Sequence, residues 1–139
     1  MAEDSETHAV WRIEERGGDA VRIWWLGIAS TPTPQDIDAM AAHILAHDVP
    51  CIVHVEHTRP PALIPSLRLV SHVRKLLVRE QDFIKRNLQG TAIQALALDP
   101  ITCALRDIAL ALYRPRKPVC ITAQPHKVAE FLCDCGGVP

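Results

Sequence analysis

The sequence predicts an α/β protein: a mixed, mostly parallel five-stranded sheet with about four helices. Apolar runs of strand length alternate with stretches whose apolar residues recur at helical spacing, in the order β-β-α-β-α-β-α-β-α. Strands joined through a helix run parallel, with a right-handed crossover. A chain of 139 residues needs no second domain. We expect a single domain over residues 9–132, an acidic N-terminal tail at 1–8 and a C-terminal tail at 133–139.

The predicted domain opens with a β-hairpin. Two β-prone runs, 9–15 and 20–28, flank Arg-Gly-Gly-Asp at 16–19, a composition typical of a tight antiparallel turn. The first run carries several charged residues and suits an edge, whereas the second becomes apolar on both faces and suits the interior. Trp24 and Trp25 must point to opposite faces of that strand. If one of them lay on an exposed patch, a homodimer would be favoured.

The next elements are a helix and a buried strand. Thr33 is placed to accept backbone N–H bonds as the helix N-cap, Pro34 suits the first turn, and Asp36 favours the positive helix end. The expected buried stripe consists of Ile37, Met40, Ala41, Ile44 and Leu45. A strand over 49–55 follows, and it ends before the prolines at 60 and 61.

Residues 67–87 predict one long amphipathic helix, or two helices with a break near 80–82. Their expected buried stripe consists of Leu69, Val70, Val73, Leu76, Leu77, Phe83 and Ile84. Gly90 is a natural stop after this helical stretch.

The C-terminal part predicts a strand, a helix, a second strand and a closing helix. The first strand covers 91–98, and Asp99-Pro100 opens a helix over 101–112 with one apolar stripe. A short buried strand follows at 119–122. Pro125 opens the final helix, whose inward residues are Val128, Ala129 and Leu132.

Composition and charge exclude several classes of protein. The net charge of -1 argues against a strongly basic nucleic-acid binder, and no apolar run approaches the roughly 20 residues of a membrane span. The acidic first residues differ from a secretory signal, so we expect a cytoplasmic protein. An odd number of cysteines, five, indicates reduced thiols rather than disulfides.

No metal or cofactor site is predicted. His43 and His47 are four residues apart, a spacing at which two histidines of one helix can coordinate a metal ion. They lack the intervening glutamate and the third ligand of a zincin. Cys133 and Cys135 supply only two of the four ligands that a structural zinc site requires.

The order of elements, with a buried strand whose loop leads into a basic amphipathic helix, resembles the STAS domain, the fold of SpoIIAA-like anti-sigma-factor antagonists. The stretch 88–132 is most similar, with a small-residue strand, an Asp-Pro helix and a Lys-Pro turn before a short strand. In such domains a serine within Asp-Ser-Ser-Gly, at a helix start, is phosphorylated to switch partner binding. The matching stretch here is Ile-Pro-Ser-Leu at 64–67, so the resemblance implies a switch at Ser66. Without the resemblance, Ser66 is a plain helix N-cap.

A basic surface is predicted around the same loop and helix. It would bind a protein partner, an anionic lipid or a phosphorylated small molecule, although a charge run is more often just a solvated face. Because interleaved aromatic residues are absent, the pattern argues against nucleic acid. The candidate binding residues are Glu56, His57, Thr58, Arg59, Arg68, Arg74, Lys75 and Arg79.

Three functions stay open. The leading one is a non-enzymatic regulatory or protein-interaction domain that binds through the Ser66 helix start. The second is a carrier that holds a lipid or an anionic metabolite in a pocket beside the 56–66 loop, edged by His54 and His57. The third is a small hydrolase or metal-dependent enzyme that uses the same histidines. Since no nucleophile, oxyanion loop or phosphate-binding glycine run accompanies them, no catalytic residue is predicted. An enclosed apolar cavity beside this loop would favour the carrier.

Overall fold

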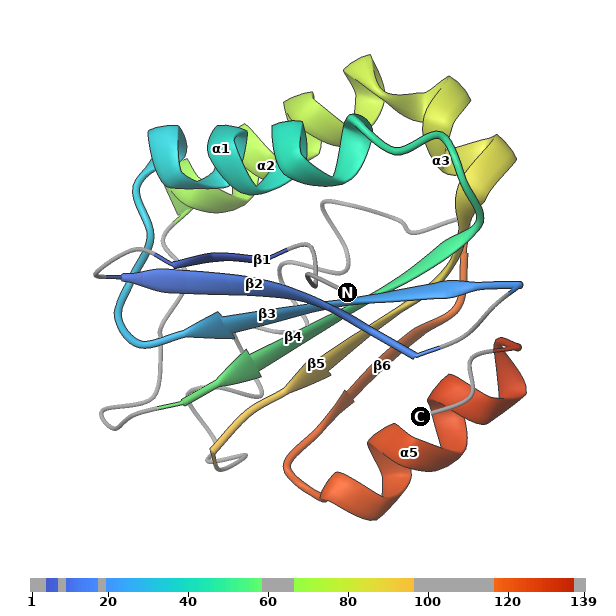
Figure 1. Cartoon of the computed structure of the whole chain (residues 1–139). Helices are drawn as coiled ribbons and strands as arrows, with labels where there is room; N and C mark the ends of the chain where they lie inside the picture. Colours follow the sequence, from blue (N-terminus) through green and yellow to red (C-terminus); the bar gives the residue numbers. More distant parts are fainter. Residues whose placement is uncertain (1–4, 8–9, 18–19, 59–66, 97–116, 137–139) are drawn as a thin grey trace.

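The described part of the chain forms a six-stranded mixed sheet with helices on both faces (Figure 1). The computed structural model describes residues 5–7, 10–17, 20–58, 67–96 and 117–136. The strands lie in sequence order: β1 Ser5–Thr7, β2 Trp11–Arg16, β3 Arg22–Ile28, β4 Cys51–His57, β5 Leu88–Gln94 and β6 Val119–Thr122. β1 and β3 each pair antiparallel with β2, and the strands from β3 to β6 pair in parallel.

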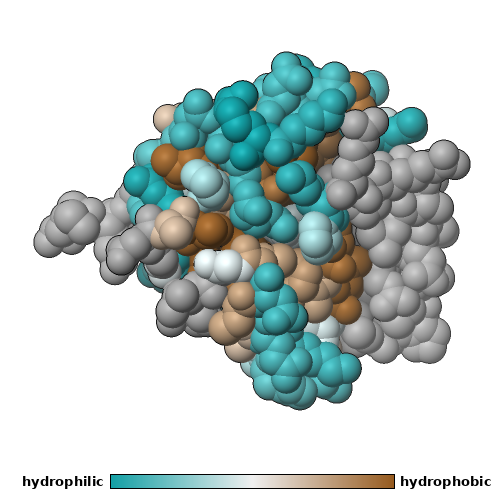
Figure 2. Space-filling model, turned by 90° about the vertical axis from the view of Figure 1, so that its right-hand side faces the viewer, coloured by the Kyte–Doolittle hydropathy of each residue, from teal (hydrophilic) through white to brown (hydrophobic). Residues whose placement is uncertain are grey.

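The helices divide between the two faces of the sheet. One face is covered by α1 Pro34–Leu45, α2 Leu67–Arg79 and α3 Gln81–Asn87 (Figure 1). The opposite face carries α5 Pro125–Asp134, which packs on β5 and β6. From the right-hand side of Figure 1, hydrophilic residues cover the outer helical surfaces and apolar residues lie between them, at the level of the sheet (Figure 2).

The α/β class and the opening hairpin are confirmed, but the sheet has one strand more than predicted. Residues 5–7, inside the stretch predicted as a tail, pair with β2, so that Ser5 lies opposite Glu14. β2 is therefore not the edge strand of the sheet. β3 is interior as predicted, and Trp24 and Trp25 are 0% and 7% exposed.

The helix signals were mostly read correctly. The Thr33 hydroxyl accepts a hydrogen bond from the Asp36 backbone N–H at 3.2 Å, and the Asp36 carboxylate accepts one from the Thr33 N–H at 2.8 Å. Residues 67–87 form two helices, because Glu80 between them leaves helical geometry with φ of -100° and ψ of 23°. The helix predicted over 101–112 lies outside the described residues.

Two details near the C-terminus differ from the prediction. Gly90 is not a stop before β5 but a buried residue within it, because the strand begins at Leu88. A Cβ at position 90 would lie 2.7 Å from the Cys135 Sγ and 3.0 Å from the Phe131 ring, so the missing side chain lets α5 lie close to β5. α5 extends to Asp134, within the stretch predicted as a tail, and Cys135 is half-buried.

Candidate functional site

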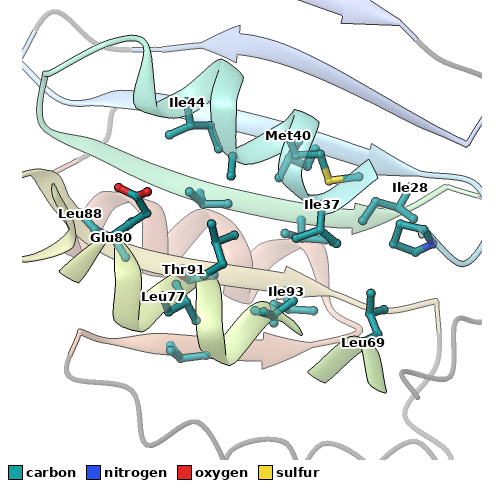
Figure 3. Close-up of a pocket in the computed structure, with 18 of the residues that line it drawn as sticks. Ile28, Ile37, Met40, Ile44, Leu69, Leu77, Glu80, Leu88, Thr91 and Ile93 are labelled. Carbon is teal, nitrogen blue, oxygen red and sulfur yellow. The ribbon is translucent and has the colours of Figure 1, made fainter. Parts of the chain in front are cut away.

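A cavity of about 460 Å³ lies between helices α1 to α3 and the sheet. Leu26 and Val53 contribute to its floor, Met40 lines it from α1, and Val73 and Leu77 line it from α2. Figure 3 shows apolar side chains from α1, from α2 and from the sheet converging on the same space. The polar side chains that line it among the described residues are Thr31, His57, Arg74, Glu80 and Thr91.

The apolar stripes of α1 and α2 both line the cavity. On α2 the stripe residues repeat at the predicted helical spacing, yet each is only half-buried: Leu69, Val70, Val73, Leu76 and Leu77. On α1, Met40 is 4% exposed, whereas Ile37 and Ile44 are half-buried. α2 packs along α1 and meets α3, while its stripe faces the open space above the sheet. The stripe that the sequence assigned to the core is therefore a cavity wall.

The two ends of the cavity differ chemically. Ile28 and Leu69 lie at one end of the view in Figure 3, and Glu80 lies near Leu88 at the other. His57 is the register partner of Ile28, so it belongs to the first end, where the parallel strands finish. At the second end, the Glu80 carboxylate accepts a hydrogen bond from the Arg79 Nε at 3.1 Å.

His57 has an unusual environment for a polar side chain. It is half-buried, and its Nδ1 is enclosed without a hydrogen-bond partner. Burial lowers the pKa of His57 from its ordinary value of 6.5, because desolvation disfavours the charged ring. At neutral pH the ring is accordingly a neutral group with one donor and one acceptor nitrogen.

His54 lies on the other face of the sheet. Since side chains alternate along β4, His54 and Glu56 point toward the α5 side and His57 points into the cavity. The His54 Nε2 is 3.0 Å from the Gln94 Oε1 and 4.0 Å from the Glu56 carboxylate. Burial lowers the pKa of His54, while the Gln94 and Glu56 contacts oppose that shift. The expectation that His54 and His57 edge one pocket is wrong, because only His57 lines the cavity.

Two of the predicted binding residues, His57 and Arg74, line the cavity. Glu56 lies on the opposite face, where its Oε1 accepts a hydrogen bond from the Trp25 indole N–H at 3.2 Å. Thr58 closes the end of the strand, because its hydroxyl donates to the Ile28 carbonyl at 3.3 Å. The predicted cluster around the loop is therefore divided between the two faces of the sheet.

The remaining predicted residues lie elsewhere. Arg68 and Lys75 are exposed and line a smaller pocket of about 240 Å³ outside the main cavity. Arg79 is exposed and pairs with Glu80. Arg59 and Ser66 lie outside the described residues, so the structure does not test the predicted switch at Ser66. Sequence reasoning missed Glu80 as a cavity residue, since its only signal was the break between two helices.

The other histidines and the cysteines form no metal site in the described ranges. His43 and His47 pack against the Trp24 ring, with centroid separations of 5.3 and 5.1 Å. No group of three His, Cys, Asp or Glu side chains is placed to hold a metal ion within the parts of the chain that are described. The four described cysteines are free thiols.

The fold and the cavity define an α/β domain with a largely apolar pocket on one side of its sheet. Comparison with protein-family models, with curated proteins and with solved structures gave no match. Over the described ranges, every helix is too short or too polar to cross a bilayer.

Proposed function

We propose that this protein is a non-enzymatic carrier that holds an elongated apolar ligand between helices α1 to α3 and the sheet. One observation supports it above all: a cavity of about 460 Å³ whose lining is apolar except for a few side chains. Small-molecule sites typically enclose roughly 300–1,000 Å³ and combine apolar walls with a few polar groups.

The apolar wall of the pocket supports an occupant. Removing apolar surface from water contributes about 25 cal/mol per Å². An apolar ligand would cover the α2 side chains that line the pocket and add contacts along that helix.

The volume also limits the size of the ligand. An engineered apolar cavity of about 150 Å³ accepts benzene. By proportion, 460 Å³ accommodates roughly fifteen to twenty carbon atoms. A single alkyl chain fits this volume and the elongated space between the two chemically different ends.

The test uses the purified full chain after delipidation. Binding of the neutral fluorophore N-phenyl-1-naphthylamine would be measured first, and straight-chain alcohols of increasing length would then displace it. Each methylene buried contributes about 0.8 kcal/mol, so the affinity should rise about four-fold per carbon and level off once the cavity is filled. Absence of fluorophore binding, or affinity that keeps rising with chain length as in micelle partitioning, would contradict the carrier.

A STAS-like topology with a partner switch is a second proposal. The element order from β2 through β5 supports it, with two antiparallel strands followed by helix-connected parallel ones. In this proposal the protein is cytoplasmic and Ser66 is the phosphorylated residue. Comparing the partners captured by wild type and by Ser66→Glu tests it, and identical partners would argue against a switch.

A further inference from the structure

We propose that the ligand is a single-chain fatty carboxylate, and that its carboxylate lies at His57 and accepts a hydrogen bond from the His57 Nε2–H. The inference rests on the proposed carrier function, and it adds the class of the head group and the direction in which the ligand lies.

The tautomer of His57 follows from its surroundings. Nδ1 is enclosed without a partner, and a buried N–H without an acceptor is rarer in proteins than an unpaired acceptor. The proton of the neutral ring therefore belongs on Nε2. His57 lines the cavity end, and we place the N–H that Nε2 carries toward that space.

A carboxylate oxygen suits this donor. Hydrogen bonds with an ionised acceptor are roughly twice as strong as neutral ones. His57 is the register partner of Ile28 at the end of the parallel strands, so a head group here would meet a donor while its chain follows the apolar floor.

The opposite end disfavours the reversed orientation. Glu80 lines that end, and a carboxylate head placed there would meet a like charge. Arg79 pairs with the Glu80 carboxylate but is exposed and does not line the cavity, so of this pair it is the carboxylate that faces the ligand. A cationic head would prefer the Glu80 end, which makes the sign of the preferred head group a direct test.

Two ligands with the same chain and opposite heads separate the orientations. Decanoate and decylammonium would each displace N-phenyl-1-naphthylamine from the wild type at pH 7.5. We expect decanoate to bind about ten-fold more tightly or better. Tighter binding of decylammonium would overturn the assignment of the head to His57.

Variants of His57 then isolate the hydrogen bond. His57→Phe should lose roughly ten-fold or more of the decanoate affinity when that affinity is expressed relative to its own affinity for the neutral fluorophore, so that any change in the cavity wall itself cancels. His57→Gln, which keeps an N–H donor, should recover part of that loss. The matched control is His72→Phe on α2, since His72 pairs with Asp38 at 2.9 Å and does not line the cavity.

The outcomes distinguish the two proposals. If the fluorophore fails to bind wild type, the carrier function itself is wrong. If the fluorophore binds but decanoate binds wild type and His57→Phe equally, the cavity stands and the role of His57 is wrong. The ¹⁵N resonance of the His57 Nε2 should also shift on addition of decanoate, and a ring with only a packing role would leave that resonance in place.

Discussion

Val73→Trp on α2 measures whether the cavity is truly empty in the ligand-free protein. Val73 is half-buried and lines the cavity. A tryptophan buries about 150–250 Å², so an indole that enters the space adds roughly 100 Å² of apolar burial over valine. At about 25 cal/mol per Å² the upper limit is about 2.5 kcal/mol, and lost rotamer freedom reduces the expected gain to about 1 kcal/mol.

In a filled core, Val73→Trp would lower the free energy of unfolding instead of raising it. Overpacking costs about 1–3 kcal/mol, so the direction of the stability change decides between an empty space and a packed one. Urea unfolding of delipidated protein measures the change in the free energy of unfolding. In a thermal scan, a gain of 1 kcal/mol should raise the Tm by roughly 3–5 °C at this chain length. The fluorophore affinity should fall at the same time, because the indole occupies the ligand's space.

Val78→Trp is the matched control on the same helix. Val78 is 62% exposed, so its substitution should change neither stability nor fluorophore binding appreciably. Destabilisation by Val73→Trp alone would refute the empty cavity.

Three further predictions concern stability. The pKa values of His54 and His57 are lowered from 6.5 in the folded protein, so above that pH both histidines are neutral in the folded and in the unfolded chain. As the pH decreases below 6.5, the unfolded chain binds protons first, so the free energy of unfolding should decrease until the folded-state pKa is passed. His57→Phe should reduce the pH dependence of the free energy of unfolding, measured by urea titrations between pH 5 and 7.5. An unchanged pH dependence would mean that groups other than His57 cause it. Thr33→Ala removes one side of the capping box and should cost about 1 kcal/mol, whereas Thr33→Ser should retain most of it; equal losses in the two variants would count against the cap. Gly90→Ala should destabilise by about 1–3 kcal/mol because its Cβ meets Cys135, and Cys135→Ala should relieve part of the loss unless the backbone is responsible.

Periodicity and end signals predicted most of the described elements. The capping residues of α1 and the apolar stripes of α1 and α2 are local properties, so they could be read without tertiary information. β1 could not, because three residues without an apolar alternation give no strand signal and depend on β2 for pairing. The predicted strand of 49–55 also ended too early, since β4 continues through His57.

The shortened strand explains the error about the histidines. Once His57 belongs to β4, the alternation of side chains places it on the face opposite His54, and no shared pocket is possible. The cavity could not be predicted from the sequence for a different reason. A helical apolar stripe shows that one side of α2 avoids water, but the same pattern arises whether that side meets protein or an apolar ligand.

The contrast between these two histidines strengthens the ligand assignment. His54 shares a hydrogen bond with Gln94, so its burial is compensated within the protein. The enclosed Nδ1 of His57 has no such partner, which favours the proton on Nε2 and, in this proposal, leaves a donor at one end of a largely apolar space. A pure hydrocarbon would fill that space but leave the donor unpaired, at a cost of about 1–3 kcal/mol, whereas a compact anion would pair the donor and leave the void. Only a ligand with both an acceptor head and an alkyl chain removes both costs, so affinity should require the two parts together.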